Sequence, residues 1–121
     1  MNIETALKEA MTIEGTIGVA LVDYESGMSL GTLGGAPGLD LEIAAAGNTE
    51  VVRAKIRTLA MLGMQDNVED ILITLGQQYH LIRPLTSSSG TLFLYLALDR
   101  GRSNLALARH ALKRIEASLQ V

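Results

Sequence analysis

The sequence contains no cysteine and few aromatic residues. The absence of cysteine excludes disulfides, thiol catalysis and thiolate metal sites. Aromatic residues make up 3% of the 121 residues, and ligand pockets usually recruit aromatic walls, so the composition argues against a small-molecule site.

No apolar run approaches the roughly 20 residues that span a bilayer. Acidic residues come early in the chain, which does not fit a signal peptide. We therefore expect a soluble, cytoplasmic protein without membrane insertion.

The charge is nearly balanced. Ten Lys and Arg residues stand against 13 Asp and Glu residues, which gives a net charge of −3. This balance gives no electrostatic reason to expect nucleic acid or an anionic membrane as a partner. The length fits one domain over residues 1–121. Because 48% of so small a chain is hydrophobic, we expect part of the apolar surface to be hidden in an oligomer interface.

Three successive apolar runs predict an antiparallel meander. They cover residues 69–75, 79–85 and 91–98, and the connections between them are too short for a crossover helix. The third run is apolar at nearly every position. Alternate residues of a strand point to opposite faces, so both faces of this strand must be covered and it must be central. Pro84 cannot donate a ladder hydrogen bond and should mark a strand end or a bulge.

The rest of the chain supplies helices and a hairpin. Periodicity predicts a helix over residues 2–13, a strand over 16–24, a turn at 23–27 and a short returning strand over 28–33. A last helix follows Ser103 or Asn104. The glycine-rich loop at 34–38 precedes the long helix, but it lacks the lysine and hydroxyl of a phosphate-binding loop. We interpret it as a connection over the sheet edge.

The long helix, predicted over residues 39–62 with a cap near Asp40, has more apolar surface than one sheet can cover. Its sheet-facing stripe is formed by Leu41, Ala45, Val52, Ile56 and Leu59. A second stripe, rich in small residues, is formed by Ala44, Gly47, Val51, Ala54, Thr58 and Met61. Small residues permit close helix approach. A helix buried within its own domain would also show two stripes, but in so small a chain we prefer cover by a second copy of the helix. A third, polar face holds Glu50, Arg53 and Arg57.

No constellation of catalytic or metal-binding residues stands out. His80 and His110 have no metal-ligand spacing, and the serines at 87–89 lack a G-x-S-x-G context. Asp66, Glu69 and Asp70 are best interpreted as a solvated turn before an edge strand. The sequence therefore predicts no catalytic residue, no cofactor and no metal, and a protein that is not an enzyme.

The order of elements and several segments resemble the Roadblock family, which is also named for a dynein light chain. The segment 16–23 with the Ser26-Gly27 turn carries this resemblance, and segments 51–56, 69–74, 79–84 and 94–99 resemble its bacterial branch. The resemblance covers essentially the whole chain. It implies an α+β, profilin-like α/β/α sandwich with a five-stranded antiparallel sheet of order 2-1-5-4-3. The first and last helices would cover one face and the long helix the other.

The resemblance also implies a function. Family members pair their third strands and long helices into dimers, and small Ras-like GTPases bind the platform of paired helices. We therefore expect a non-catalytic homodimer that regulates such a GTPase or acts as its scaffold. The predicted partner-binding residues are Glu50, Arg53 and Arg57. The predicted dimer interface consists of Gly47, Val51, Ala54, Thr58, Met61, Ile71 and Ile73.

Two other classes of function stay open at this point. A sensory module with a profilin-like or PAS-like sheet would need an internal cavity with converging polar groups, against which the packed central strand counts. A purely structural dimerisation module would pair in the same way but bind no GTPase.

Overall fold

The computed structural model describes residues 1–86 and 90–121, so the serine run considered above lies outside the described residues. The elements follow the predicted order. They are α1 (Ile3–Met11), β1 (Thr16–Asp23), β2 (Ser29–Gly34), α2 (Leu41–Met61), β3 (Ile71–Thr74), β4 (Gln78–Pro84), β5 (Leu92–Asp99), the short 3₁₀ helix η1 (Arg100–Arg102) and α3 (Leu105–Ser118).

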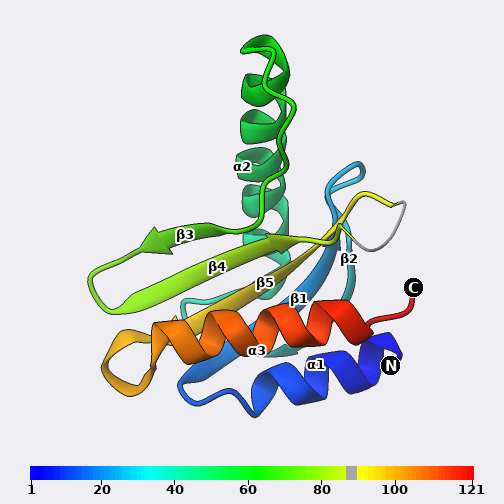
Figure 1. The fold of residues 1–121 in the computed structure, drawn as a ribbon. Helices are drawn as coiled ribbons and strands as arrows, with labels where there is room; N and C mark the ends of the chain where they lie inside the picture. The colour runs from blue at the N-terminus through cyan, green and yellow to red at the C-terminus, as the bar shows by residue number, and fades with distance from the viewer. Residues whose placement is uncertain (87–89) are drawn as a thin grey trace.

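The five strands form one antiparallel sheet of order β2-β1-β5-β4-β3, as expected. The strand β5 is central, and Pro84 is the last residue of β4, as its missing N–H predicts. The strand β3 is shorter than predicted and covers Ile71–Thr74. The side chains of Glu69 and Asp70, just before it, pair with Lys113 and Arg109 of α3. Figure 1 shows α1 and α3 side by side on one face of the sheet and α2 on the other.

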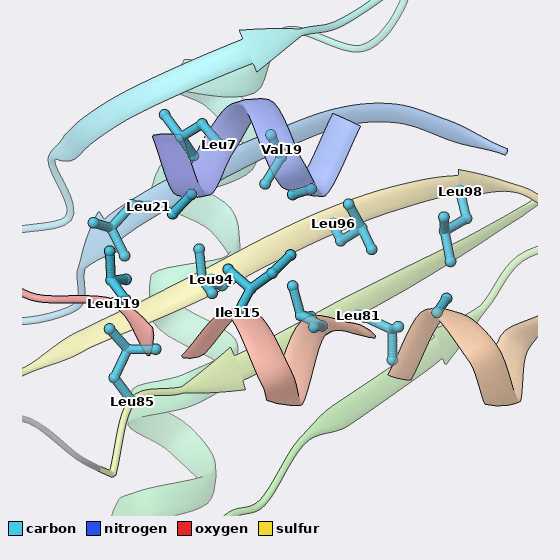
Figure 2. Close-up of a cluster of buried hydrophobic side chains, with 14 residues drawn as sticks. Leu7, Val19, Leu21, Leu81, Leu85, Leu94, Leu96, Leu98, Ile115 and Leu119 are labelled. Atoms are coloured by element: carbon cyan, nitrogen blue, oxygen red, sulfur yellow. The ribbon is translucent and has the colours of Figure 1, made fainter. Parts of the chain in front are cut away.

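Two hydrophobic clusters separate the sheet from its helices. Alternate residues of β5 divide between them: Leu94, Leu96 and Leu98 face α1 and α3, whereas Phe93 and Tyr95 face α2. Figure 2 shows the first cluster, in which leucines from β1, β4 and β5 meet side chains of the two outer helices. Both faces of the central strand are thus covered, as its apolar sequence requires.

The helix α2 extends beyond the sheet that it covers. Asp40 caps its N-terminus by accepting hydrogen bonds from the backbone N–H groups of Glu42 and Ile43. Its buried residues end at Val52, and residues 53–61 rise roughly a further 13 Å along the helix axis. Figure 1 shows these turns standing clear of the sheet, with the chain returning alongside them. The predicted sheet-facing stripe therefore holds only as far as Val52, and Ile56 is 38% exposed.

Within the described residues, no helix combines the length and the apolar composition needed to cross a membrane.

Candidate interaction surface

The second stripe of α2 lies open in the structure. Gly47, Ala54 and Thr58 are exposed, Val51 is half-buried, and the side chain of Met61 is 80% exposed. A Cβ atom added at Gly47 would meet no described atom within 4 Å, so the backbone there is open to close approach. The predicted interface residues of α2 thus form one accessible face on the single chain.

A groove runs along part of this face. It has a volume of about 760 Å³ and lies between α2 and the segment that returns to β3. Val51, Ala54, Thr58 and Leu59 form its wall on α2, and residues 66–71 form the opposite wall. Ile71 thereby joins the predicted helix residues at one site.

The edge of the sheet lies next to this groove. Among the described strands β3 pairs only with β4, so its other edge carries unpaired backbone groups. Ile71 and Ile73 are half-buried and pack against the cluster beneath α2. The structure therefore brings the predicted interface residues of α2 and β3 to the same side of the molecule, while their role in pairing stays a prediction.

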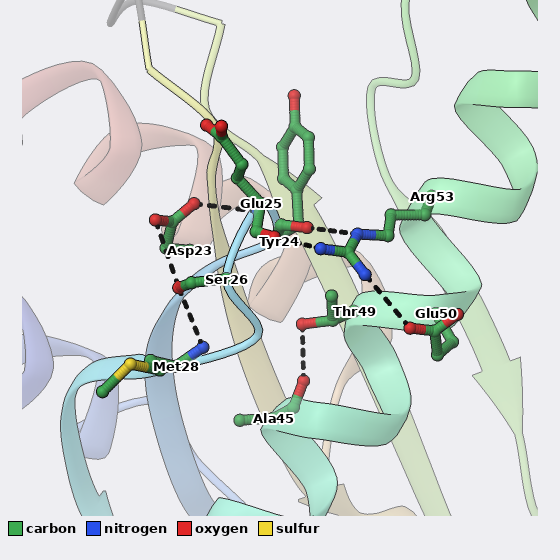
Figure 3. A network of polar contacts seen from close by, with 9 residues as sticks. All are labelled: Asp23, Tyr24, Glu25, Ser26, Met28, Ala45, Thr49, Glu50 and Arg53. Carbon is green, nitrogen blue, oxygen red and sulfur yellow. Dashed lines mark hydrogen bonds and ion pairs between the residues drawn. The ribbon is translucent and has the colours of Figure 1, made fainter.

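The polar face of α2 divides into an anchored residue and exposed ones. The guanidinium of Arg53 donates from Nε to the carbonyl oxygen of Tyr24 at 2.6 Å, from Nη2 to the carbonyl oxygen of Glu25, and from Nη1 to Glu50 at 3.2 Å (Figure 3). Arg57 is exposed and makes no hydrogen bond or ion pair within the described residues. Arg53 is thus engaged with the β1–β2 turn, whereas Glu50 and Arg57 extend toward solvent.

The turn that Arg53 contacts is itself held by a carboxylate. Asp23 accepts hydrogen bonds from Thr91 Oγ1 at 2.6 Å, from the backbone N–H of Glu25 at 2.9 Å and from Ser26 Oγ at 3.3 Å. These bonds, that of Thr91 first, lower the pKa of Asp23 below its usual value of 3.8. Gly27 takes the positive φ of +80° that its place in the turn predicts. The turn therefore forms a defined surface beside α2.

A neutral polar network lies under the N-terminal half of α2. His80 Nδ1 is 3.2 Å from the Tyr95 hydroxyl, and its Nε2 is 2.8 Å from Gln78 Oε1. The Tyr95 hydroxyl also hydrogen-bonds to Asn48 of α2. Burial lowers the pKa of His80 and raises that of Tyr95 to about 12. The sequence did not reveal this network, because its members come from three separate elements.

The other histidine of the chain is not part of this network. His110 is exposed on α3, away from His80. The described part of the chain has no group of three or more His, Cys, Asp or Glu side chains that could hold a metal ion.

Comparison with known protein structures shows which fold the chain has. No family model and no curated protein matches the sequence. The Roadblock/LC7 domain from Streptomyces avermitilis is 13% identical with a TM-score of 0.81, over 98% of this chain and 94% of that one. MglB from Myxococcus xanthus is 18% identical with a TM-score of 0.75, over 93% and 77% of the two chains. An MglB described with a tetrameric arrangement is 16% identical with a TM-score of 0.67, over 95% and 88%. The chain therefore has the fold of the Roadblock/LC7 domain.

Proposed function

We propose that this chain is a non-catalytic homodimer that regulates a small Ras-like GTPase, or acts as its scaffold, through a platform of paired α2 helices. One observation carries the proposal: the exposed, small-residue face of α2 lies beside the unpaired edge of β3. A second copy related by a two-fold axis would cover both features at once, because such an interface uses the same patch on each subunit.

The details of this surface support pairing rather than solvation. Gly47 and Ala54 allow two helix backbones to approach closely, and Val51 and Ile71 supply apolar contact area in the groove. Pairing of the two β3 edges would satisfy the backbone groups that a single chain leaves unpaired. The MglB with a tetrameric arrangement is a protein of similar fold that self-assembles, which favours the same behaviour here.

The paired helices would present a mixed-charge surface to the partner. Glu50 and Arg57 extend from each α2, and the two-fold axis doubles the set. Mixed charge favours specificity and association rate over affinity, and the planar fork of Arg57 can meet a carboxylate of the GTPase bidentately. Arg53 belongs to the same face, but its donors already contact the turn. We therefore assign Arg53 to holding that turn beside the platform, and direct recognition to Glu50 and Arg57.

We infer regulation by binding rather than by chemistry in this chain. Both ring nitrogens of His80 are engaged in hydrogen bonds, with Tyr95 and with Gln78. A scaffold or regulator needs only a shaped, charged surface, which α2 supplies.

Calorimetric titration tests this proposal. Ras-like GTPases encoded in the same genome, loaded with GDP or a non-hydrolysable GTP analogue, are titrated into the dimer. We expect one of them to bind, and Arg57→Glu to weaken binding at least about tenfold, which corresponds to 1.4 kcal/mol. Arg114→Glu is the matched control, because Arg114 lies exposed on α3 at the opposite face of the sheet.

Two results would count against the proposal. Binding that is undiminished in Arg57→Glu would move the partner site away from α2. Failure of every such GTPase to bind would leave the paired helices as a structural dimerisation module.

A thermal-shift screen with metabolites tests the alternative of a sensory module. A ligand of such a module would have to bind in the groove between α2 and residues 66–71.

A further inference from the structure

His80 lies one strand in from the edge at which we propose that two copies pair. It is on β4, directly across from Ile73 of β3 on one side and from Ala97 of β5 on the other. Neighbouring strands are about 4.8 Å apart, so the imidazole is close to the predicted interface. The side chain is only partly buried in the single chain. A second copy that covers α2 and β3 would therefore remove further water from it.

The hydrogen bonds around the ring fit the neutral imidazole. With Gln78 Oε1 facing it at 2.8 Å, Nε2 carries the proton and donates. Nδ1 is then the acceptor for the Tyr95 hydroxyl at 3.2 Å. Protonation would turn Nδ1 from an acceptor into a donor, so the Tyr95 hydroxyl could no longer donate to it. The charged form thus loses the hydrogen bond from Tyr95 of β5 to His80 of β4 that the neutral form maintains.

Among the described residues, no charged side chain forms a hydrogen bond or an ion pair with His80. The α2 helix presents the neutral amide of Asn48, β5 presents Tyr95, β3 presents Ile73, and β4 itself presents Gln78. Within the described residues, burial is the effect that shifts the pKa of His80, and it lowers it. The titratable side chains that line the neighbouring groove are Lys55, Asp66, Glu69 and Asp70, and none of them hydrogen-bonds to the ring.

We infer that His80 makes the pairing of two copies depend on pH: the dimer forms around the neutral imidazole, and protonation of His80 drives its dissociation. This inference rests on the proposed function, because it requires that a second copy covers the α2 and β3 surface. Covering the ring disfavours its charged form. The separated chains therefore bind more protons than the dimer, and the dimer weakens as the pH falls through the pKa of the imidazole.

Sedimentation equilibrium at pH 7.5 and pH 5.5 tests the inference. If pairing lowers the pKa of each of the two imidazoles by about one unit, the dissociation constant rises toward a limit of about 100-fold at pH values below both pKa values, because each unit is tenfold per site, and part of this rise should be measured at pH 5.5. His80→Gln keeps a neutral polar side chain and should remove most of this dependence. His110→Gln is the matched control, since these are the two histidines of the chain and His110 is exposed on α3.

A second measurement does not depend on the folding of the His80 variant. Nuclear magnetic resonance titration of the His80 imidazole should give a lower pKa in the wild-type dimer than in the monomeric variant Ala54→Arg. A dimer of equal affinity at both pH values, or equal His80 titrations in dimer and monomer, overturns this inference alone. A wild-type chain that is monomeric at pH 7.5 overturns the proposed dimer as well.

Discussion

Arg53 of α2 donates a hydrogen bond from Nε to the backbone carbonyl oxygen of Tyr24, at a distance of 2.6 Å. A second bond from the same guanidinium reaches the carbonyl oxygen of Glu25. The two contacts fix the β1–β2 turn against the middle of α2 (Figure 3). A residue that the sequence assigns to an outward polar face thus connects two elements of the fold.

Replacing Arg53 should destabilise the chain. Arg53→Ala removes two hydrogen bonds from a charged donor to the backbone, and such bonds contribute roughly 1.5–3 kcal/mol each when buried. Because the side chain is 39% exposed, we expect a smaller total loss of about 1–2 kcal/mol in the free energy of unfolding. Arg53→Lys should not restore it, because an ammonium lacks the planar fork that reaches both carbonyls.

Urea denaturation measures this effect, with Arg57→Ala as its control. Arg57 is one helical turn away and makes no hydrogen bond or ion pair within the described residues, so its removal should change stability by no more than about 0.5 kcal/mol. Equal stability of the two alanine variants would show that the contacts of Arg53 with the turn do not stabilise the fold.

A buried ion pair should show a larger effect. Arg83 Nε lies 2.7 Å from Glu116 Oε1, and the two side chains are 7% and 6% exposed. Thr86 donates to the other oxygen of Glu116. Arg83→Met leaves the carboxylate buried without its cation, so we expect a loss of about 3–5 kcal/mol in the free energy of unfolding. Thermal or urea denaturation measures it.

The controls for the ion pair are a double variant and an exposed pair. Adding Glu116→Gln to Arg83→Met removes the buried negative charge that Arg83 had paired and should recover part of the loss. Glu4→Gln breaks the exposed pair of Glu4 with Lys8 and should cost no more than about 0.5 kcal/mol. A variant Arg83→Met as stable as Glu4→Gln would show that the buried carboxylate of Glu116 does not depend on Arg83.

Local patterns predicted the elements and their caps. The unbroken apolar run of β5 predicted a central strand, Asp40 caps α2 as predicted, and of the two residues considered for α3 the cap is Asn104. The order of the whole sheet required the resemblance, because the meander alone relates β3, β4 and β5 but does not say where β1 pairs.

Contacts between distant residues were not predictable in this way. Arg53 meets Tyr24 across 29 positions, and Arg83 meets Glu116 across 33. No spacing rule relates such pairs, since they depend on how the elements pack. The periodicity of α2 also continued past Val52, where the sheet no longer covers the helix. Periodicity reveals an apolar face but not the molecule that covers it. In the proposed dimer, the second copy covers the part of α2 that the sheet does not.

The central claim is that two copies pair through α2 and β3, and multi-angle light scattering at micromolar concentration and pH 7.5 tests it most directly. We predict twice the chain mass of 12.9 kDa for the wild type. Ala54→Arg or Met61→Glu should give the single-chain mass with an unchanged circular dichroism spectrum, because each places a charge in the closely packed interface. Leu107→Glu, at an exposed position of α3, should remain a dimer. A wild-type mass of 12.9 kDa would contradict the account.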